Sequence, residues 1–359
     1  MQPNNNPFEH GNPVPPERYV QRRVAQATVV SRVVNYGQSS AITGEPRMGK
    51  TSLLLYLAAP EMRAQLYGEW AERLIFSPLM DAHKLSAFGI AQFWTRALRS
   101  VYAHFGVVSS ALNDEADSLE HLQAALSTAR QALGALERQA AGYTVLTIPA
   151  PLQIELEAKH KDVIALTARW QAATRPSNAP SSSIAACLAA LSAQPGDPFA
   201  LEDLFAALKA ENWRFVLLID EYDCFQSRLH THDFYGGLRS VATLSQGALC
   251  VIIAGRMSLE TFHQRTVAMN QGSPYFNYMA EIGLSVFAPD ESAGLLARAG
   301  DRFTSEDCQR LLTLTGGHPH RLQVAAAALW DAYENAARWQ HVEAALKIGD
   351  QGLGACLIP

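Results

Sequence analysis

The chain has 359 residues, enough to bury one large core or two moderate ones. With 48% hydrophobic and 18% charged residues, its composition is that of an ordinary soluble globular protein. Its net charge of −5 provides no general attraction to nucleic acid or to an anionic membrane, which leaves only a local basic patch for such a role.

The N-terminal segment, residues 1–24, is predicted to be an extended arm because its first part is rich in Pro and Asn. It lacks the basic and apolar regions of a signal peptide, and no apolar run in the chain approaches the ~18 residues of a membrane span. Five cysteines without any C-x-x-C pair argue against a zinc site or a disulfide framework. We therefore expect a protein of the reducing cytoplasm.

A helical pattern runs from Tyr19 to Val34.

The stretch from Gly44 to Thr51 matches the phosphate-binding loop G-x-x-x-x-G-K-S/T at every position. Residues 38–43 before it read as a strand and residues 51–58 after it as a helix, so the context also fits. The glycines allow a tight turn with N–H groups pointing inward, Lys50 reaches the β- and γ-phosphates, and the Thr51 hydroxyl binds Mg²⁺. The expected nucleotide contacts in this loop are Gly44, Glu45, Pro46, Arg47, Met48, Gly49, Lys50, Thr51 and Ser52.

Further stretches read as strands of the same sheet: residues 73–80, 214–221, 248–254 and 282–287. We predict an α/β ATPase core made of residues 25–106 and 206–290. Between its halves, residues 107–205 carry leucines in steps of three and four and a Pro- and Ser-rich linker, which predicts a helical insertion. This insertion is either a hairpin packed on the core or a partner-binding element. The helical pattern of residues 291–359 predicts a C-terminal lid.

Two carboxylates follow the apolar strand that begins at Arg214, where the carboxyl edge of a parallel sheet faces a site. Asp220 is the expected residue on the Mg²⁺ side, and Glu221 is the expected general base for an attacking water. The alternative is a solvated strand end without a catalytic role. Asp223 lies close enough to tune the site and is assigned no role of its own.

Arg256 follows the next strand, where its guanidinium can stabilise charge that develops on the γ-phosphate; the alternative is an ordinary surface arginine. Farther along, Pro319 marks the start of a helix whose free N–H groups point toward an anion or a base. His318, or less favourably Arg321, is then a nucleotide sensor in the lid; otherwise the histidine caps the turn. Residues 230–233 (His-Thr-His-Asp) lack a third ligand group at a recognised spacing and are interpreted as a polar loop.

Taken together, these motifs resemble a bacterial STAND-type ATPase of the AAA+ class. The resemblance covers most of the chain outside residues 107–205. The matching segments are Asn6-Pro7-Phe8, Gly11 to Val20, Gly44 to Thr51, Phe215 to Asp223, Ala254-Gly255-Arg256 and Gly316-Gly317-His318-Pro319.

The resemblance implies a P-loop NTPase fold with a parallel five-stranded sheet in the order 5-1-4-3-2. It places Val20 and Arg22 beside the adenine and makes Arg256 a first sensor. It also implies a lid contact to the nucleotide through Gly317, His318 and Pro319. The chain departs from the family at Gln21, where a glycine is usual.

For function, the resemblance implies a switch that depends on ATP and Mg²⁺ and alternates between resting and assembled states, often in signalling or defence against phage. Relatives commonly carry a fused effector and a repeat sensor, whereas this chain ends about forty residues after Pro319. We therefore expect a separately encoded effector or sensor as partner. A nucleotide-dependent homo-oligomer is a further hypothesis.

The leading interpretation is a regulatory ATPase with slow hydrolysis. One alternative is a nucleic-acid-associated AAA+ ATPase, such as a loader or transposition adaptor, which the acidic net charge disfavours. A second is a nucleotide-gated scaffold with negligible hydrolysis. A third is a small-molecule kinase, which is disfavoured because the pair Asp220 and Glu221 suits activation of water. No base-specific motif excludes GTP.

Overall fold

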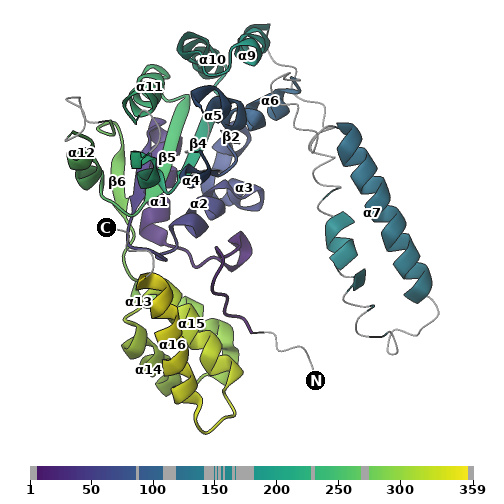
Figure 1. The fold of residues 1–359 in the computed structure, drawn as a ribbon, viewed down its shortest axis with the longest axis vertical. Helices are drawn as coiled ribbons and strands as arrows, with labels where there is room; N and C mark the ends of the chain where they lie inside the picture. The colour runs from purple at the N-terminus through teal and green to yellow at the C-terminus, as the bar shows by residue number, and fades with distance from the viewer. Residues whose placement is uncertain are drawn as a thin grey trace.

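A computed structural model of the chain describes residues 6–85, 89–107, 119–140, 182–227, 231–267 and 275–354, with short stretches between 149 and 166. Its centre is a parallel sheet with helices on both faces, and a separate helical bundle lies beside the carboxyl edge of that sheet (Figure 1). No helix in these described parts is both long and apolar enough to cross a membrane.

In the described part of the chain the sheet has six parallel strands, and its main path runs β2-β4-β5-β1-β6, with β3 paired to β4. The five strands on this path follow the expected order, but the expected count of five is wrong. The strands are β1 (Ser40–Thr43), β2 (Leu74–Phe76), β3 (Met80–Asp81), β4 (Arg214–Asp220), β5 (Leu249–Gly255) and β6 (Ala280–Gly283).

The extra strand arises because the stretch expected at 73–80 is divided at Pro78, which has no N–H to donate to a ladder. Ser77 bridges the break: its N–H donates to the Val216 carbonyl at 2.9 Å, and its hydroxyl accepts from the Leu218 N–H at 2.9 Å. Both β2 and β3 therefore remain beside β4.

Alternate side chains of the buried strands supply two cores, one on each face of the sheet. One face packs on the helices nearest the phosphate loop. These are α1 (Arg23–Ser31), which continues as η2 (Arg32–Tyr36), α2 (Lys50–Ala58), α3 (Arg63–Tyr67) and η4 (Gly68–Arg73). The short helix η3 (Pro60–Met62) connects α2 to α3. The other face packs mainly on α5 (Ile90–Ala97), α6 (Arg99–Phe105), α9 (Ser182–Ala193), α10 (Pro198–Ala210), α11 (Thr231–Leu244) and α12 (Leu259–Val267).

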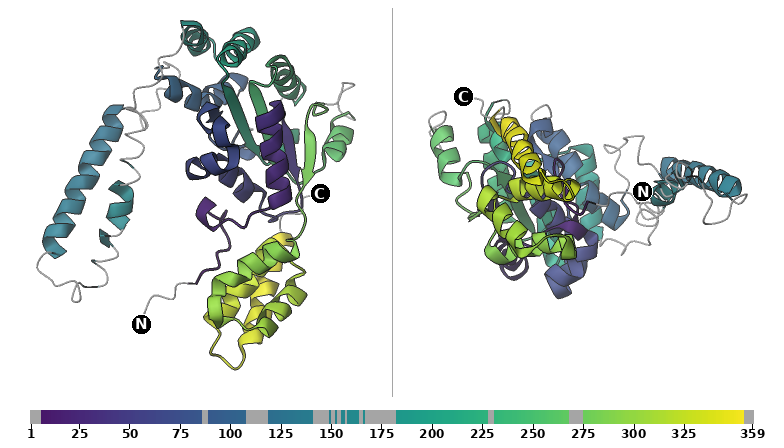
Figure 2. Two further views of the ribbon diagram at one scale, coloured as in Figure 1. Left: turned by 180° about the vertical axis from the view of Figure 1, so that it is seen from behind. Right: turned by 90° about the horizontal axis from the view of Figure 1, so that it is seen from below.

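Two helices that lie wholly or partly within the predicted insertion, residues 107–205, belong to this core. Leu188 of α9 and Leu204 and Phe205 of α10 are fully buried in the same cluster as Phe215 of β4. This part of the predicted insertion therefore packs on the core, which is one of the two alternatives that the sequence left open. An apolar helix face looks the same in sequence whether it covers a sheet or a hairpin partner. The helix α7 (Leu119–Ala140) does stand away from the sheet (Figures 1 and 2).

The C-terminal bundle has a hydrophobic core of its own. Phe8 of the N-terminal arm inserts into it and stacks on Phe303 with ring centroids 5.6 Å apart. Because Phe8 inserts into the bundle, the arm links the bundle to the loop side of the sheet. The arm also includes a short turn of helix, η1 (Pro16–Arg18). The bundle consists of α13 (Pro289–Leu296), η8 (Ala297–Arg302), α14 (Ser305–Thr315), α15 (Pro319–Asp331) and α16 (Arg338–Gly354).

Candidate functional site

The phosphate loop joins β1 to α2 in the way the motif predicts. Gly49 has a φ of +88°, a left-handed conformation that favours glycine, and α2 begins at the next residue. At Gly44 a Cβ atom would lie 2.6 Å from the carbonyl oxygen of Leu284, so only glycine fits there. The N-terminus of α2, with its positive dipole end, therefore faces the interior of the loop.

Lys50 lies folded against this loop. Its side chain is buried, and its ammonium donates to the carbonyl oxygens of Gly44 at 2.8 Å and Glu45 at 2.9 Å. Burial lowers the pKa of Lys50, whereas the charges of Glu221 and Asp220 oppose this shift. Because an ammonium has three protons, one remains for an anion in the loop.

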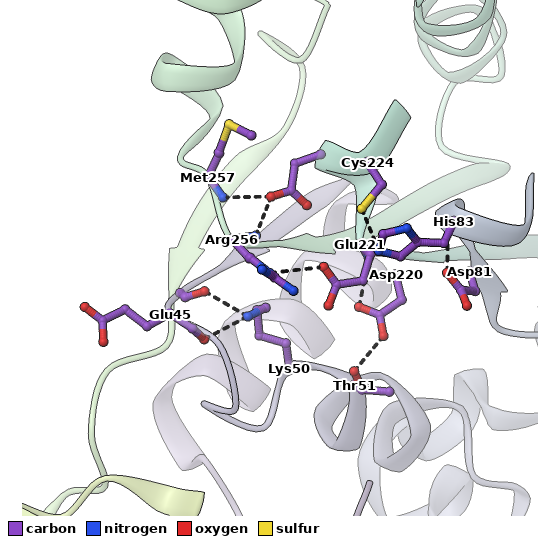
Figure 3. A network of polar contacts seen from close by, with 12 residues as sticks. Glu45, Lys50, Thr51, Asp81, His83, Asp220, Glu221, Cys224, Arg256 and Met257 are labelled. Atoms are coloured by element: carbon purple, nitrogen blue, oxygen red, sulfur yellow. Dashed lines mark hydrogen bonds and ion pairs between the residues drawn. The ribbon is translucent and has the colours of Figure 1, made fainter. Parts of the chain in front are cut away.

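The end of β4 meets α2 at the predicted metal-side pair. The Thr51 hydroxyl donates to Asp220 Oδ2 at 2.6 Å, and the Glu221 N–H donates to Asp220 Oδ1 at 3.0 Å (Figure 3). Burial raises the pKa of Asp220, and the hydrogen bond from Thr51 opposes that rise. A hydroxyl and a carboxylate within contact distance are the hard oxygen donors that Mg²⁺ prefers, so these residues fit that ion.

Glu221 has an unusual backbone conformation for a residue other than glycine. Its φ is +53°, a left-handed conformation that costs a non-glycine residue roughly 1–2 kcal/mol. Its Oε2 atom lies 3.6 Å from Nε of Arg256, the residue after β5. Burial and then the charge of Asp220 raise the pKa of Glu221, while Arg256 lowers it. A carboxylate with a raised pKa suits a general base.

Asp223 has a positional role that sequence reasoning did not assign. Its Oδ2 accepts hydrogen bonds from the N–H groups of Arg256 at 3.0 Å and Met257 at 3.3 Å. The preceding Tyr222 donates its hydroxyl to the Met257 carbonyl at 2.5 Å. The short helix η7 (Tyr222–Ser227) therefore holds the turn that carries Arg256. No local pattern signals a contact between residues 33 positions apart.

A cavity of about 300 Å³ lies over the loop, a volume at the lower end of the ~300–1,000 Å³ typical of ligand sites. Glu221 and Arg256 line it together with the loop residues from Pro46 to Ser52. The N-terminal arm and the bundle complete its walls. Their lining residues are Glu9, His10, Gly11, Asn12, Pro13, Val14, Arg18, Tyr19, Val20, Arg22, Phe287, Pro319, His320 and Gln323.

Arg22 lies in this wall as a largely buried anchor. Its Nη2 donates to the Ser285 carbonyl at 2.5 Å, its Nε lies 3.3 Å from Glu291 Oε2, and its guanidinium stacks 5.0 Å from the Phe287 ring centroid. It therefore fastens the arm to the segment that joins β6 to the bundle. Its Nη1 atom is buried and makes no hydrogen bond.

In the bundle, the cavity is lined by His320 and not by the predicted His318. His318 caps α15, its Nδ1 accepting from the Arg321 N–H at 3.5 Å, which is the alternative that the sequence left open. His320 Nε2 lies 2.6 Å from Nη1 of Arg47 in the loop. Two residues into a helix, a side chain points to a different side from the cap, which explains the difference. The interpretation of residues 230–233 as a polar loop is wrong for residues 231–233, which begin α11; residue 230 and the side chains of all four lie outside the described parts.

The parallel sheet with its strand–loop–helix unit has the arrangement of a P-loop NTPase fold. No protein-family model matches the chain, and no curated protein does. One similar solved structure is the Walker-type ATPase PABY2304 of Pyrococcus abyssi, with 15% identity, a TM-score of 0.49, and 97% of this chain and 77% of that chain covered. A similarity this low carries no argument about function, so the site is interpreted from its own geometry.

Proposed function

We propose that this chain binds ATP with Mg²⁺ and hydrolyses it slowly, as a nucleotide-dependent regulatory switch. The observation that carries the proposal is convergence. The phosphate loop, the contact between Thr51 and Asp220, and the carboxylate of Glu221 all meet at one cavity that the arm and bundle enclose. These parts come from two distant segments of the chain, the loop with the start of α2 and the end of β4.

The residues of this cavity divide the chemistry among them. The loop N–H groups and the third proton of Lys50 bind the phosphates, while Thr51 and Asp220 would hold Mg²⁺, which supplies charge neutralisation at the β- and γ-oxygens. Glu221 accepts a proton from the attacking water. Arg256 is placed to stabilise the charge that develops during transfer.

Two buried polar atoms favour a whole nucleotide over inorganic phosphates. They are Arg22 Nη1 and Gln323 Oε1, which belong to residues lining the cavity and make no hydrogen bond. Buried polar groups nearly always have partners, and the edge of a nucleobase offers both donors and acceptors. The acceptor on Gln323 suits the amino group of adenine, which is why we propose ATP.

Two measurements test this function. Calorimetric titration with Mg²⁺-ATP should show one site in the wild type, much weaker binding in Lys50→Ala, and wild-type affinity in Lys209→Ala, which removes an exposed lysine of α10. Phosphate release should occur in the wild type and be lost in Glu221→Gln. Equal affinity of the two lysine variants would refute the proposed phosphate site.

The ion pair between Glu221 and Arg256 at 3.6 Å favours a second candidate function, that of a nucleotide-gated scaffold. With its carboxylate engaged by a guanidinium, the base is less available to a water. In that case the wild type and Glu221→Gln bind nucleotide equally and both release negligible phosphate. Turnover by the wild type alone excludes the scaffold.

The switch proposal extends to assembly, either of this chain with itself or with a separate effector or sensor, in signalling or defence as the sequence resemblance implies. Its support is that the cavity walls come from the sheet, the arm and the bundle, so that a ligand contacts all three. We expect light scattering to report a larger particle with a non-hydrolysable ATP analogue than without it. An unchanged size contradicts self-assembly.

A further inference from the structure

A second cluster of metal-binding side chains lies beside the proposed catalytic carboxylate. His83, Glu221 and Cys224 each offer one ligand atom, and these three atoms lie within 4.8 Å of one another. His83 Nε2 and Cys224 Sγ are 2.8 Å apart (Figure 3). His83 follows β3, Glu221 follows β4, and Cys224 belongs to η7.

The backbone holds these three residues together. Strands β3 and β4 are parallel with Asp81 opposite Asp220, so the residues that follow them leave the sheet at the same level. The His83 N–H donates to Asp81 Oδ1 at 2.9 Å at the start of α4 (Ala82–Leu85). The Cys224 N–H donates to the Glu221 carbonyl at 2.9 Å.

An imidazole nitrogen, a thiolate and a carboxylate form the mixed ligand set that borderline divalent cations select, with a water completing a tetrahedron. The thiolate and carboxylate together neutralise a 2+ charge. Mg²⁺ prefers oxygen ligands and is suited to Thr51 and Asp220 instead. We propose that His83, Glu221 and Cys224 form a site for Zn²⁺ or a similar transition-metal cation.

Binding would proceed with simple chemistry: Cys224 forms an S–Zn bond, and its proton leaves to the solvent. The His83 side chain is exposed, so the ion has access from the surface. The sequence argued against zinc because it has no paired cysteines, but these ligands are brought together by the fold, with His83 and Cys224 separated by 141 positions.

The proposed consequence is inhibition, and this part rests on the proposed hydrolysis. A metal ion bound to Glu221 occupies the carboxylate that would accept a proton from water. The same ion leaves Lys50 and Thr51 free to bind the nucleotide. We therefore expect Zn²⁺ to lower the rate of phosphate release with little change in nucleotide affinity.

The binding test uses the full chain and does not require activity. Co²⁺ titration should produce a thiolate-to-cobalt charge-transfer band with one ion per chain, and calorimetry with Zn²⁺ should give the same stoichiometry. In Cys224→Ser the band should be absent and the Zn²⁺ dissociation constant at least about tenfold higher, as for other losses at metal sites. His83→Asn, at an exposed position, should weaken binding to a similar extent.

The matched control is Cys187→Ser, which removes another half-buried thiol, on α9, and should leave the band unchanged. No band in the wild type, or an equal band in Cys224→Ser, overturns the metal site. Equal Zn²⁺ inhibition of the wild type and Cys224→Ser under excess Mg²⁺-ATP overturns its inhibitory role. A Cys224-dependent band in a chain without ATPase activity would support the metal site while refuting the proposed function.

Discussion

Replacing Asp223 with asparagine tests whether the turn after β5 positions Arg256. Asp223 is 8% exposed, and its Oδ2 accepts the backbone N–H groups of Arg256 at 3.0 Å and Met257 at 3.3 Å. Asparagine keeps the size and removes the charge. Because hydrogen bonds to a charged group are worth about 1.5–3 kcal/mol and neutral ones about half, we expect a loss of about 1–2 kcal/mol in the free energy of unfolding.

The effect on turnover follows from the position of the guanidinium. Removing one group that stabilises the transition state lowers kcat by about 10²–10³. Asp223→Asn leaves Arg256 in place but less firmly held, so we expect kcat to fall about tenfold with KM unchanged. Urea unfolding measures the first effect, and steady-state phosphate release measures the second.

A double-mutant cycle separates a positioning role from a purely structural one. In an Arg256→Ala background, Asp223→Asn should have no further effect on kcat, because the group through which it acts is already missing. The control Asp203→Asn, at an exposed position of α10, should match the wild type. Unchanged kcat in Asp223→Asn, or an equal loss in both backgrounds, would refute the reasoning.

Three further predictions concern affinity and pH. Lys50→Ala removes a charge-assisted contact worth about 1.5–3 kcal/mol, so titration should show ATP affinity reduced about 10- to 100-fold. Because burial raises the pKa of Glu221 and the base acts as a carboxylate, the hydrolysis rate should fall as the pH drops through a value above the ordinary 4.5; a pH–rate profile without this acid limb contradicts that role. In the bundle, burial of Asp307 favours a raised pKa, but hydrogen bonds from Thr304 and the charge of Arg338 outweigh it, so the pKa is lowered. The stabilisation from a lowered pKa is fully present above the unfolded value near 3.8 and is lost as the pH falls through the folded pKa. Asp307→Asn should therefore cost about 1–2 kcal/mol in urea unfolding at neutral pH and progressively less as the pH falls through that lower value.

The phosphate loop and the acidic strand end could be predicted because their information is local. From Gly44 to Thr51 the motif is contiguous, and its glycines indicate the tight backbone conformation that the loop needs. Five consecutive apolar residues before Asp220 indicate a strand buried on both faces, as β4 is. All five of these apolar residues, 215–219, are buried, so this edge of the sheet was predictable too.

Other features depend on which faces of the molecule meet. The apolar faces of α9 and α10 predict burial but not the partner, which is why they were placed in the insertion. His320 lies at the cavity in place of His318 because the first turn of α15 turns one side chain toward the cap and the other toward Arg47.

Contacts between residues that are far apart in the sequence could not be predicted from residue spacing. Asp223 holds the turn of Arg256, and His83 meets Cys224, only because parallel strands end at one edge of the sheet. Local backbone preferences and hydrophobic periodicity act over a few residues, so they can be recognised directly in the sequence. Proximity between distant side chains is produced by packing the whole fold, and in this protein it is packing that assembles the residues around Glu221.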